Sequence, residues 1–218
     1  MSEESRTQQI HALLKEIREC DLCELKPRYT PCVYGSEYSK ILVVSWEPSK
    51  GEYEGRGGKC PLGDVMASSM LSGREPPFWT CNYWLGKSEP FSSRDFFWIH
   101  RANCAGGNRQ QCSCKFLERA IGLVRPQAIF IFGGAAADYF FPKQKYRFPN
   151  KRMLHLVRSR DLTYTQNRWT IKCQVFFHWS RRNRCFRWEE HRAAHQESVK
   201  VLHTLVNELR STSASQRA

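Results

Sequence analysis

The 218-residue sequence contains no apolar segment long enough to cross a membrane. Its longest apolar stretch, AIFIFGGAAADYFF, is interrupted by Asp138 and is shorter than the roughly 20 apolar residues of a spanning helix. The amino-terminal residues MSEESRTQQ are polar and partly acidic, which does not fit a secretory signal sequence. We therefore expect an intracellular protein, located in the cytoplasm and nucleoid or in a nucleus, with no membrane partner.

Acidic residues are scarce relative to basic ones. The chain has 21 aspartate and glutamate residues against 34 lysine and arginine residues, so its formal net charge is +13 at pH 7. Such an excess of positive charge favours a polyanionic partner, most often a nucleic acid. Internal repeats and low-complexity segments are also lacking, and a hydrophobic content of 41% is typical of a globular protein. The composition predicts a globular protein that binds a nucleic acid, and we expect it to be a monomer.

Apolar runs alternate with helical patterns along the chain. Buried strands are predicted at 41–46, 95–102 and 127–132, with one or two more in 168–179. Helices are predicted at 8–19, 65–71, 112–126 and 187–209, and a long loop at 73–93. This alternation favours a parallel sheet with helices on both faces. We expect one α/β domain at residues 8–210, a three-layer αβα sandwich around a mostly parallel four-stranded sheet, with flexible termini at 1–7 and 211–218.

Polar residues follow three of the predicted strands at the point where each strand ends. SWEPS follows the first strand, HRANC the second and HWSRR the last. In parallel sheets the ligand crevice lies beyond the carboxyl ends of the strands, so we expect these segments to meet at one site. The last segment places a histidine beside several arginines, whose guanidinium groups are well suited to hold phosphates.

Ten cysteines need an explanation in a chain that we expect to be intracellular, where thiols stay reduced. Cys20 and Cys23 form a CxxC pair at a helix end, Cys104 ends a strand and Cys114 opens a helix. A close pair and a looser pair of thiolates suit an iron–sulfur cluster or a zinc ion. Cys112 is an alternative to Cys114, and buried thiols without a ligand are the alternative to a metal site.

The order of these segments resembles the iron–sulfur branch of the uracil-DNA glycosylase superfamily, families four and five. The resemblance rests on ECDLC, VVSWEPS, HRANC, GGNRQ, CKFLERAIGLVRPQAIFIFGGAAA and FFHWS, which follow that branch's order over most of the chain. It implies the fold of that superfamily and a [4Fe–4S] cluster on Cys20, Cys23, Cys104 and Cys114, with zinc as the alternative. The implied role of the cluster is structural, because thiolate bonds to a metal contribute folding energy.

Several positions that form the base pocket in that branch carry different residues in this sequence. Trp46 stands where family four has a water-positioning carboxylate, and Glu47 follows one residue later. Pro61 stands where the family has an aromatic residue that stacks on the base, and His100 where it has an asparagine that reads the base edge. The final motif keeps its histidine and serine but has Trp179 in place of proline. The resemblance therefore implies the frame of the family with a rebuilt pocket.

The resemblance also implies a role for each site residue. His178 would donate a hydrogen bond to the base oxygen, whose negative charge grows as the N-glycosidic bond breaks. Glu47 would position the attacking water. The other expected substrate contacts are Ser45, Trp46, Pro61, His100 and Ser180. The expected phosphate contacts, on either side of an extruded base, are Asn108, Arg109, Arg181, Arg182 and Arg184.

Two functions follow from this reading. The first is a monofunctional DNA glycosylase of base-excision repair, a hydrolase that removes uracil or another deaminated or modified base. The second is an iron–sulfur protein that binds damaged or single-stranded DNA and cleaves it weakly or not at all. The second is motivated by the missing carboxylate at Trp46 and the missing aromatic residue at Pro61. A structural hydrogen bond remains the alternative for His100, His178 and Glu47.

Overall fold

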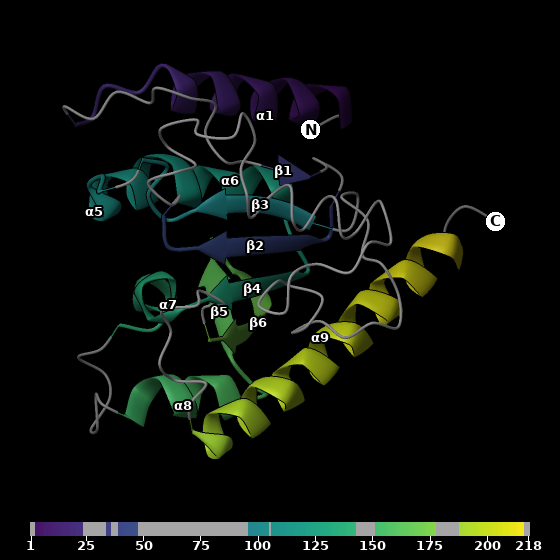
Figure 1. Ribbon diagram of the computed structural model, residues 1–218. Coiled ribbons are helices and arrows are strands. Elements are labelled where there is room, and N and C mark those ends of the chain that lie inside the picture. The colour runs from purple at the N-terminus through teal and green to yellow at the C-terminus, as the bar shows by residue number, and fades with distance from the viewer. Residues whose placement is uncertain are drawn as a thin grey trace, which may run out of the picture.

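The computed structural model of the chain describes residues 3–23, 34–35, 39–47, 96–104, 106–142, 151–177 and 188–215. These residues have a mixed α/β fold (Figure 1). The strands are β1 (Tyr34–Gly35), β2 (Ile41–Ser45), β3 (Phe96–His100), β4 (Ala128–Phe132), β5 (Thr163–Gln166) and β6 (Trp169–Phe176). The helices are α1 (Glu3–Arg18), α5 (Arg109–Cys112), the π-helical turn η1 (Ser113–Leu117), α6 (Glu118–Val124), α7 (Gly134–Phe140), α8 (Arg152–Arg158) and α9 (Glu189–Ser215).

The strands form one sheet in the order β1-β3-β2-β4-β6-β5. The four inner strands β3, β2, β4 and β6 are parallel, and β1 and β5 pair antiparallel at the two edges. The prediction of a mostly parallel sheet is confirmed, but four strands were too few. β5 folds back onto β6 through a two-residue turn at Asn167 and Arg168, which have φ angles of 48° and 69°. Because this turn contains no glycine, the sequence lacks the usual signal of a tight turn between β5 and β6, and β5 was not predicted.

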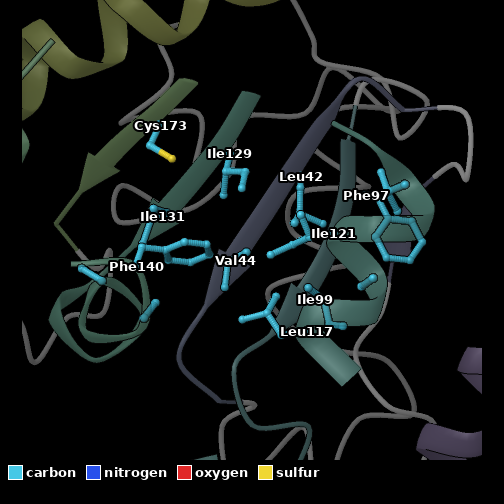
Figure 2. Close-up of a cluster of buried hydrophobic side chains, with 14 of the residues drawn as sticks. Leu42, Val44, Phe97, Ile99, Leu117, Ile121, Ile129, Ile131, Phe140 and Cys173 are labelled. Atoms are coloured by element: carbon cyan, nitrogen blue, oxygen red, sulfur yellow. The ribbon is translucent and has the colours of Figure 1, made fainter. Parts of the chain in front are cut away.

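The inner strands are buried because their residues are apolar on both faces. Every residue of β2, β3 and β4 is buried, as expected for strands covered by helices on either side. Alternate side chains therefore point into two separate cores. One core joins residues such as Leu42, Val44, Ile129 and Ile131 to the helices α6 and α7 (Figure 2).

The second core lies on the opposite face of the sheet. Ile41, Val43 and Phe130 pack there against Leu202 and Val206, which belong to α9. This long helix crosses the molecule diagonally, while α1 packs outside α6 at one end (Figure 1). Both terminal helices are longer than the sequence pattern indicates, because polar turns extend them to Glu3 and Ser215. The helix expected at 65–71 and the loop expected at 73–93 lie outside the described residues.

Of the described helices, none is both long and apolar enough to span a lipid bilayer.

Candidate active site and cysteine group

The turn after β2 and the segment after β3 run side by side at the carboxyl edge of the sheet. The backbone N–H of Arg101 donates to the carbonyl of Ser45 over 2.8 Å, and that of Ala102 donates to Trp46 over 3.0 Å. The parallel ladder thus continues past both strands. The structure confirms that the SWE and HRANC segments meet at this edge, where ligands of parallel sheets bind.

His100 is held inside this edge by two residues of the same sheet face. Its Nδ1 lies 2.6 Å from Oγ of Ser45, and the indole Nε1 of Trp98 donates to the same oxygen over 3.1 Å. All three residues are buried. Among the described residues, the other imidazole nitrogen, Nε2 of His100, is buried without a hydrogen-bond partner. A buried polar atom without a partner is unfavourable, so this nitrogen is a candidate ligand contact.

Trp46 and Glu47 both contact the segment that follows Cys104. Trp46 is 37% exposed, and the guanidinium of Arg109 lies over its ring, 4.8 Å from the centroid. Glu47 accepts a hydrogen bond from the backbone N–H of Gly106 through Oε2, over 3.1 Å. The strand-end turn is therefore attached on both sides to the segment that follows Cys104.

The segment after Cys104 turns sharply into a helix. Gly106 has a φ of 77°, and a Cβ on Gly107 would lie 3.1 Å from the carbonyl oxygen of Cys104. Asn108 then caps α5, because its side chain accepts from the backbone N–H of Gln111 over 3.1 Å. This structural role of Asn108 was missed in the sequence, although NRQQ has a typical capping residue at its start.

Four cysteines from three parts of the chain approach one another beside this segment. Burial, and then the thiols of Cys23, Cys112 and Cys20, raise the pKa of Cys104 to about 12. Burial likewise raises the pKa of Cys112. A hydrogen bond from the backbone N–H of Asn103 opposes this effect, whereas the thiols of Cys20 and Cys23 add to it. Metal-free thiols are thus unfavourable to ionise here, and a cation would favour their thiolates.

Cys112, and not Cys114, is the fourth member of this group. Cys112 is buried, whereas Cys114 is exposed and its Sγ lies 3.6 Å from the side-chain Nε2 of Gln110. The sequence prediction placed Cys114 at the start of a helix, but the helix already begins at Arg109. Residues two apart in a helix point to nearly opposite sides, so only one of the two cysteines faces inward.

The neighbourhood of the cysteine group contains further unpaired polar atoms. Asn103 is buried, and neither its side-chain oxygen nor its side-chain nitrogen has a hydrogen-bond partner in the described parts of the chain. Within the same ranges, no three histidine, cysteine, aspartate or glutamate side chains are arranged to hold a single metal ion. In a [4Fe–4S] cluster each thiolate binds a different iron, so its ligands need not converge on one point.

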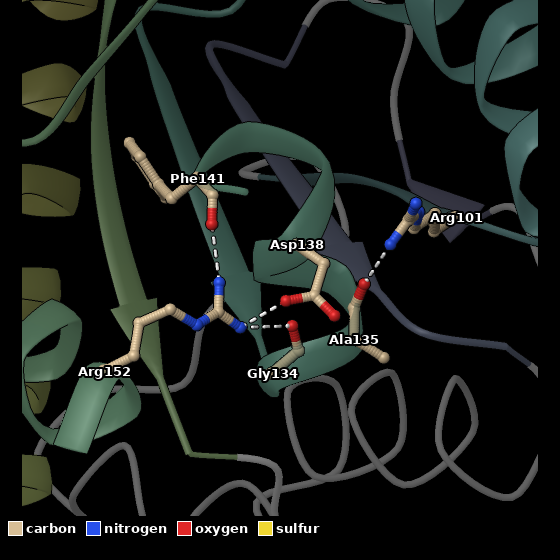
Figure 3. A network of polar contacts seen from close by, with 6 residues as sticks. All are labelled: Arg101, Gly134, Ala135, Asp138, Phe141 and Arg152. Carbon is tan, nitrogen blue, oxygen red and sulfur yellow. Dashed lines mark hydrogen bonds and ion pairs between the residues drawn. The ribbon is translucent and has the colours of Figure 1, made fainter. Parts of the chain in front are cut away.

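Two arginines hold α7 from opposite sides (Figure 3). Arg101, next to His100 in the chain, donates to the carbonyl of Ala135 over 2.6 Å. Arg152, from α8, donates to the carbonyls of Gly134 and Phe141 and forms an ion pair with Asp138. Neither arginine was singled out in the sequence, because nothing in its immediate sequence indicates burial. They fix the helix that follows β4 relative to the carboxyl edge of the sheet.

The remaining predicted site residues lie outside the described residues. They are Pro61, His178, Ser180, Arg181, Arg182 and Arg184. β6, which precedes five of them, runs parallel to β4 and pairs Phe176 with Phe132 at its end. The carboxyl end of β6 therefore lies at the same edge of the sheet as those of β2 and β3.

Comparison with known proteins does not identify a family. No protein-family model matches the sequence, and no curated protein is significantly similar to it.

Proposed function

We propose that the protein is a DNA glycosylase of the uracil-DNA glycosylase type, with a single αβα domain that removes uracil or another deaminated base. The observation that carries the proposal is the buried imidazole of His100. It lies at the carboxyl edge of a parallel sheet, and its Nε2 has no partner among the described residues. Such an edge is where α/β proteins bind nucleotides and their parts, and the net charge of +13 favours a nucleic-acid substrate.

Hydrolysis of an N-glycosidic bond leaves positive charge on the sugar and negative charge on the departing base. Water adds to the sugar carbon as the bond to the base nitrogen breaks, and the base takes up a proton. In this proposal His178 donates to the base oxygen, a contact that is worth about 2.7–4 kcal/mol in comparable sites. Glu47 positions the water: its Oε2 binds Gly106, and its Oε1 has no partner within the described ranges.

Contacts to the DNA backbone come from the basic residues around the same edge. Arg109 is exposed above the ring of Trp46, which leaves its guanidinium edge available for a phosphate. We assign Arg181, Arg182 and Arg184 to the phosphates that flank an extruded nucleotide. Trp46 and Arg109 then lie at the rim of the pocket, where an aromatic ring can stack on a neighbouring base.

We further propose that Cys20, Cys23, Cys104 and Cys112 hold a [4Fe–4S] cluster. The support is the shared electrostatic environment of their thiols and the burial of three of them. When bound, the cluster supplies a covalent link between the end of α1 and the loop after β3, with no part in the reaction. Elemental analysis separates the alternatives, because the cluster gives a brown protein with iron and sulfide, whereas zinc gives a colourless one. A protein purified anaerobically without iron or sulfide would exclude the cluster.

The glycosylase activity is tested with oligonucleotides that each carry one candidate base: uracil, hypoxanthine or xanthine. The protein is incubated at stoichiometric concentration with single-stranded and duplex forms, and abasic sites are detected by strand cleavage in alkali. We expect cleavage at one or more of these bases and none in His178→Ala. Without an abasic site from any base, the glycosylase proposal is wrong.

A DNA-binding protein without turnover is the second candidate. It is favoured by Trp46, which occupies the position expected for a catalytic carboxylate and forms an exposed stack with Arg109. This candidate predicts tight binding to the same oligonucleotides with no product, and binding that is unchanged in Glu47→Ala. Binding falls with salt under both candidates because phosphate contacts release counterions, so product formation is the measurement that separates them.

A further inference from the structure

The hydrogen bonds around His100 determine which of its nitrogens carries a proton. The indole N–H of Trp98 is a donor only, so Oγ of Ser45 accepts that bond. Apart from this indole, the only side-chain partner of Ser45 among the described residues is Nδ1 of His100, at 2.6 Å. The hydroxyl hydrogen of Ser45 therefore has one acceptor in this part of the chain, and that acceptor is Nδ1.

The opposite tautomer is unfavourable in this arrangement. If Nδ1 carried the hydrogen, two N–H groups would donate to the same hydroxyl oxygen, and the hydrogen of the hydroxyl would remain buried without an acceptor. A buried donor without a partner costs about 1–3 kcal/mol, which corresponds to a roughly 5- to 150-fold preference for the other tautomer. The contact geometry thus favours Nδ1 as acceptor and Nε2 as donor.

We propose that Ser45 and Trp98 are positioning residues that fix Nε2 of His100 as a hydrogen-bond donor, so that the site selects a base with an exocyclic oxygen facing His100. The inference rests on the proposed function and specifies its substrate class. That oxygen is O4 of a pyrimidine or O6 of a purine, where deamination replaces an amino group with a carbonyl. An amino group of the base at the same place would bring its N–H against the Nε2–H of His100, so that two donors would face each other without an acceptor.

A single fixed donor forms hydrogen bonds with fewer groups of the base than a side-chain amide does. An asparagine or glutamine amide has both a donor and an acceptor, so it can pair with a carbonyl and with the ring N–H beside it. The imidazole Nε2 can pair only with the carbonyl. We therefore expect the site to accept more than one oxo base, purine or pyrimidine, as long as the carbonyl is present.

The tautomer is measured directly by nitrogen-15 NMR of the full-length protein labelled at histidine. Long-range couplings distinguish a protonated ring nitrogen from a bare one, without any need for activity. We expect His100 to have hydrogen on Nε2 and a bare Nδ1. In Ser45→Ala this preference should be lost, whereas Ser45→Thr, which keeps the hydroxyl, should retain it. A wild-type spectrum with a bare Nε2 overturns the inference, whether or not the variants fold.

The base contact is measured by binding, with a 2′-fluoroarabino sugar at the target nucleotide to suppress cleavage. Two oligonucleotides are compared, one with uracil and one with 2-pyrimidinone, which lacks only the O4 oxygen and the ring N–H. We expect the wild type to bind uracil on the order of tenfold more tightly, a difference of about 1.4 kcal/mol. In His100→Phe, which removes the donor and keeps a ring, this difference should disappear.

The contribution of the base's ring N–H is tested by repeating the comparison of the two oligonucleotides with His100→Asn. The asparagine amide can contact both the carbonyl and the ring N–H of uracil. We expect this variant to discriminate between the two oligonucleotides more strongly than the wild type does. Equal binding of both oligonucleotides by the wild type overturns the inference even if the protein releases uracil. A preference for uracil that depends on His100, without any abasic product, supports the inference and rejects the glycosylase.

Discussion

Arg152 is a buried charge that binds one short helix and the end of that helix. Its guanidinium binds the carbonyls of Gly134 and Phe141 and the carboxylate of Asp138. A buried ion pair of this kind contributes little net free energy compared with a pair of apolar residues, but removing the arginine alone is costly because Asp138 and the two carbonyls lose this donor. It therefore fixes α7 against α8 more than it stabilises the protein.

We predict that Arg152→Met lowers the free energy of unfolding by about 3–5 kcal/mol, because it leaves the Asp138 carboxylate without this cation in a partly buried site. Urea denaturation at 25 °C measures the change. Arg119→Met is the matched control, since Arg119 pairs with Glu16 over 2.5 and 2.9 Å on the surface. The control should change the free energy of unfolding by about 0–1 kcal/mol. Equal losses in both variants would contradict the prediction.

At the scale of single residues, the sequence predicted where side chains lie in the sheet better than it predicted their hydrogen-bond partners. The placement of Ser45, Trp46 and His100 at strand ends followed from apolar runs that stop there, and the structure agrees. The bond between Ser45 and His100 joins two strands that are far apart in the chain, so no local pattern indicates it. The burial of Arg152 was not predicted either, because a basic segment usually lies on the surface.

The helical segment from Arg109 to Val124 contains a π-helical turn at Ser113–Leu117. Such turns insert one extra residue into a helix and are frequent beside functional sites. Here the turn directly follows Cys112. The loop before the segment is equally constrained, since Gly107 packs against the backbone of Cys104.

Two glycines of this region should respond in opposite ways to replacement by alanine. A Cβ at position 107 would lie 3.1 Å from the Cys104 carbonyl, so Gly107→Ala should destabilise the protein by about 1–3 kcal/mol. Gly122 lies within α6, and a Cβ there would meet no atom within 4 Å. Gly122→Ala should stabilise by about 0.5–1 kcal/mol, because alanine loses less backbone entropy in a helix. Thermal and urea unfolding of both variants measure the difference, and stabilisation by Gly107→Ala would be inconsistent with this packing.

At the scale of elements, the helix boundary decided which cysteine faces inward. The run CKFLERAI indicates a helix, and a start near Cys114 follows from its apolar spacing. The structure begins the helix at Arg109, because Asn108 caps it and the preceding glycines complete the turn. Helix ends depend on such local geometry and are the least predictable part of an element.

For the whole molecule, the sequence predicted the architecture from its apolar runs. β2, β3 and β4 are short, apolar and buried on both faces, which is the pattern of a parallel sheet in any α/β protein. The edge strands β1 and β5 carry no such pattern and were missed. An edge strand needs only one neighbour, so its sequence is weakly constrained.

The cysteine group allows a test that compares two residues of the same helical segment. If the proposed cluster is present, Cys112→Ser should lose most of the iron and its visible absorbance. Cys114→Ser should keep both, because the side chain of Cys114 is exposed. Iron and sulfide analysis after anaerobic purification measures the outcome. Loss of iron in Cys114→Ser with retention in Cys112→Ser would assign the fourth ligand to Cys114 instead.

The four thiols of the group belong to segments that precede β2, follow β3 and open the next helix. Their assembly requires closure of the long loop between Cys23 and Cys104, which is intrinsically slow. If these thiols hold the proposed cluster, the nascent chain has no preformed site for iron while it is being synthesised. The proposed cluster would then be inserted into a nearly folded chain, and a shortage of iron would leave a pool of folded apoprotein able to be rescued later.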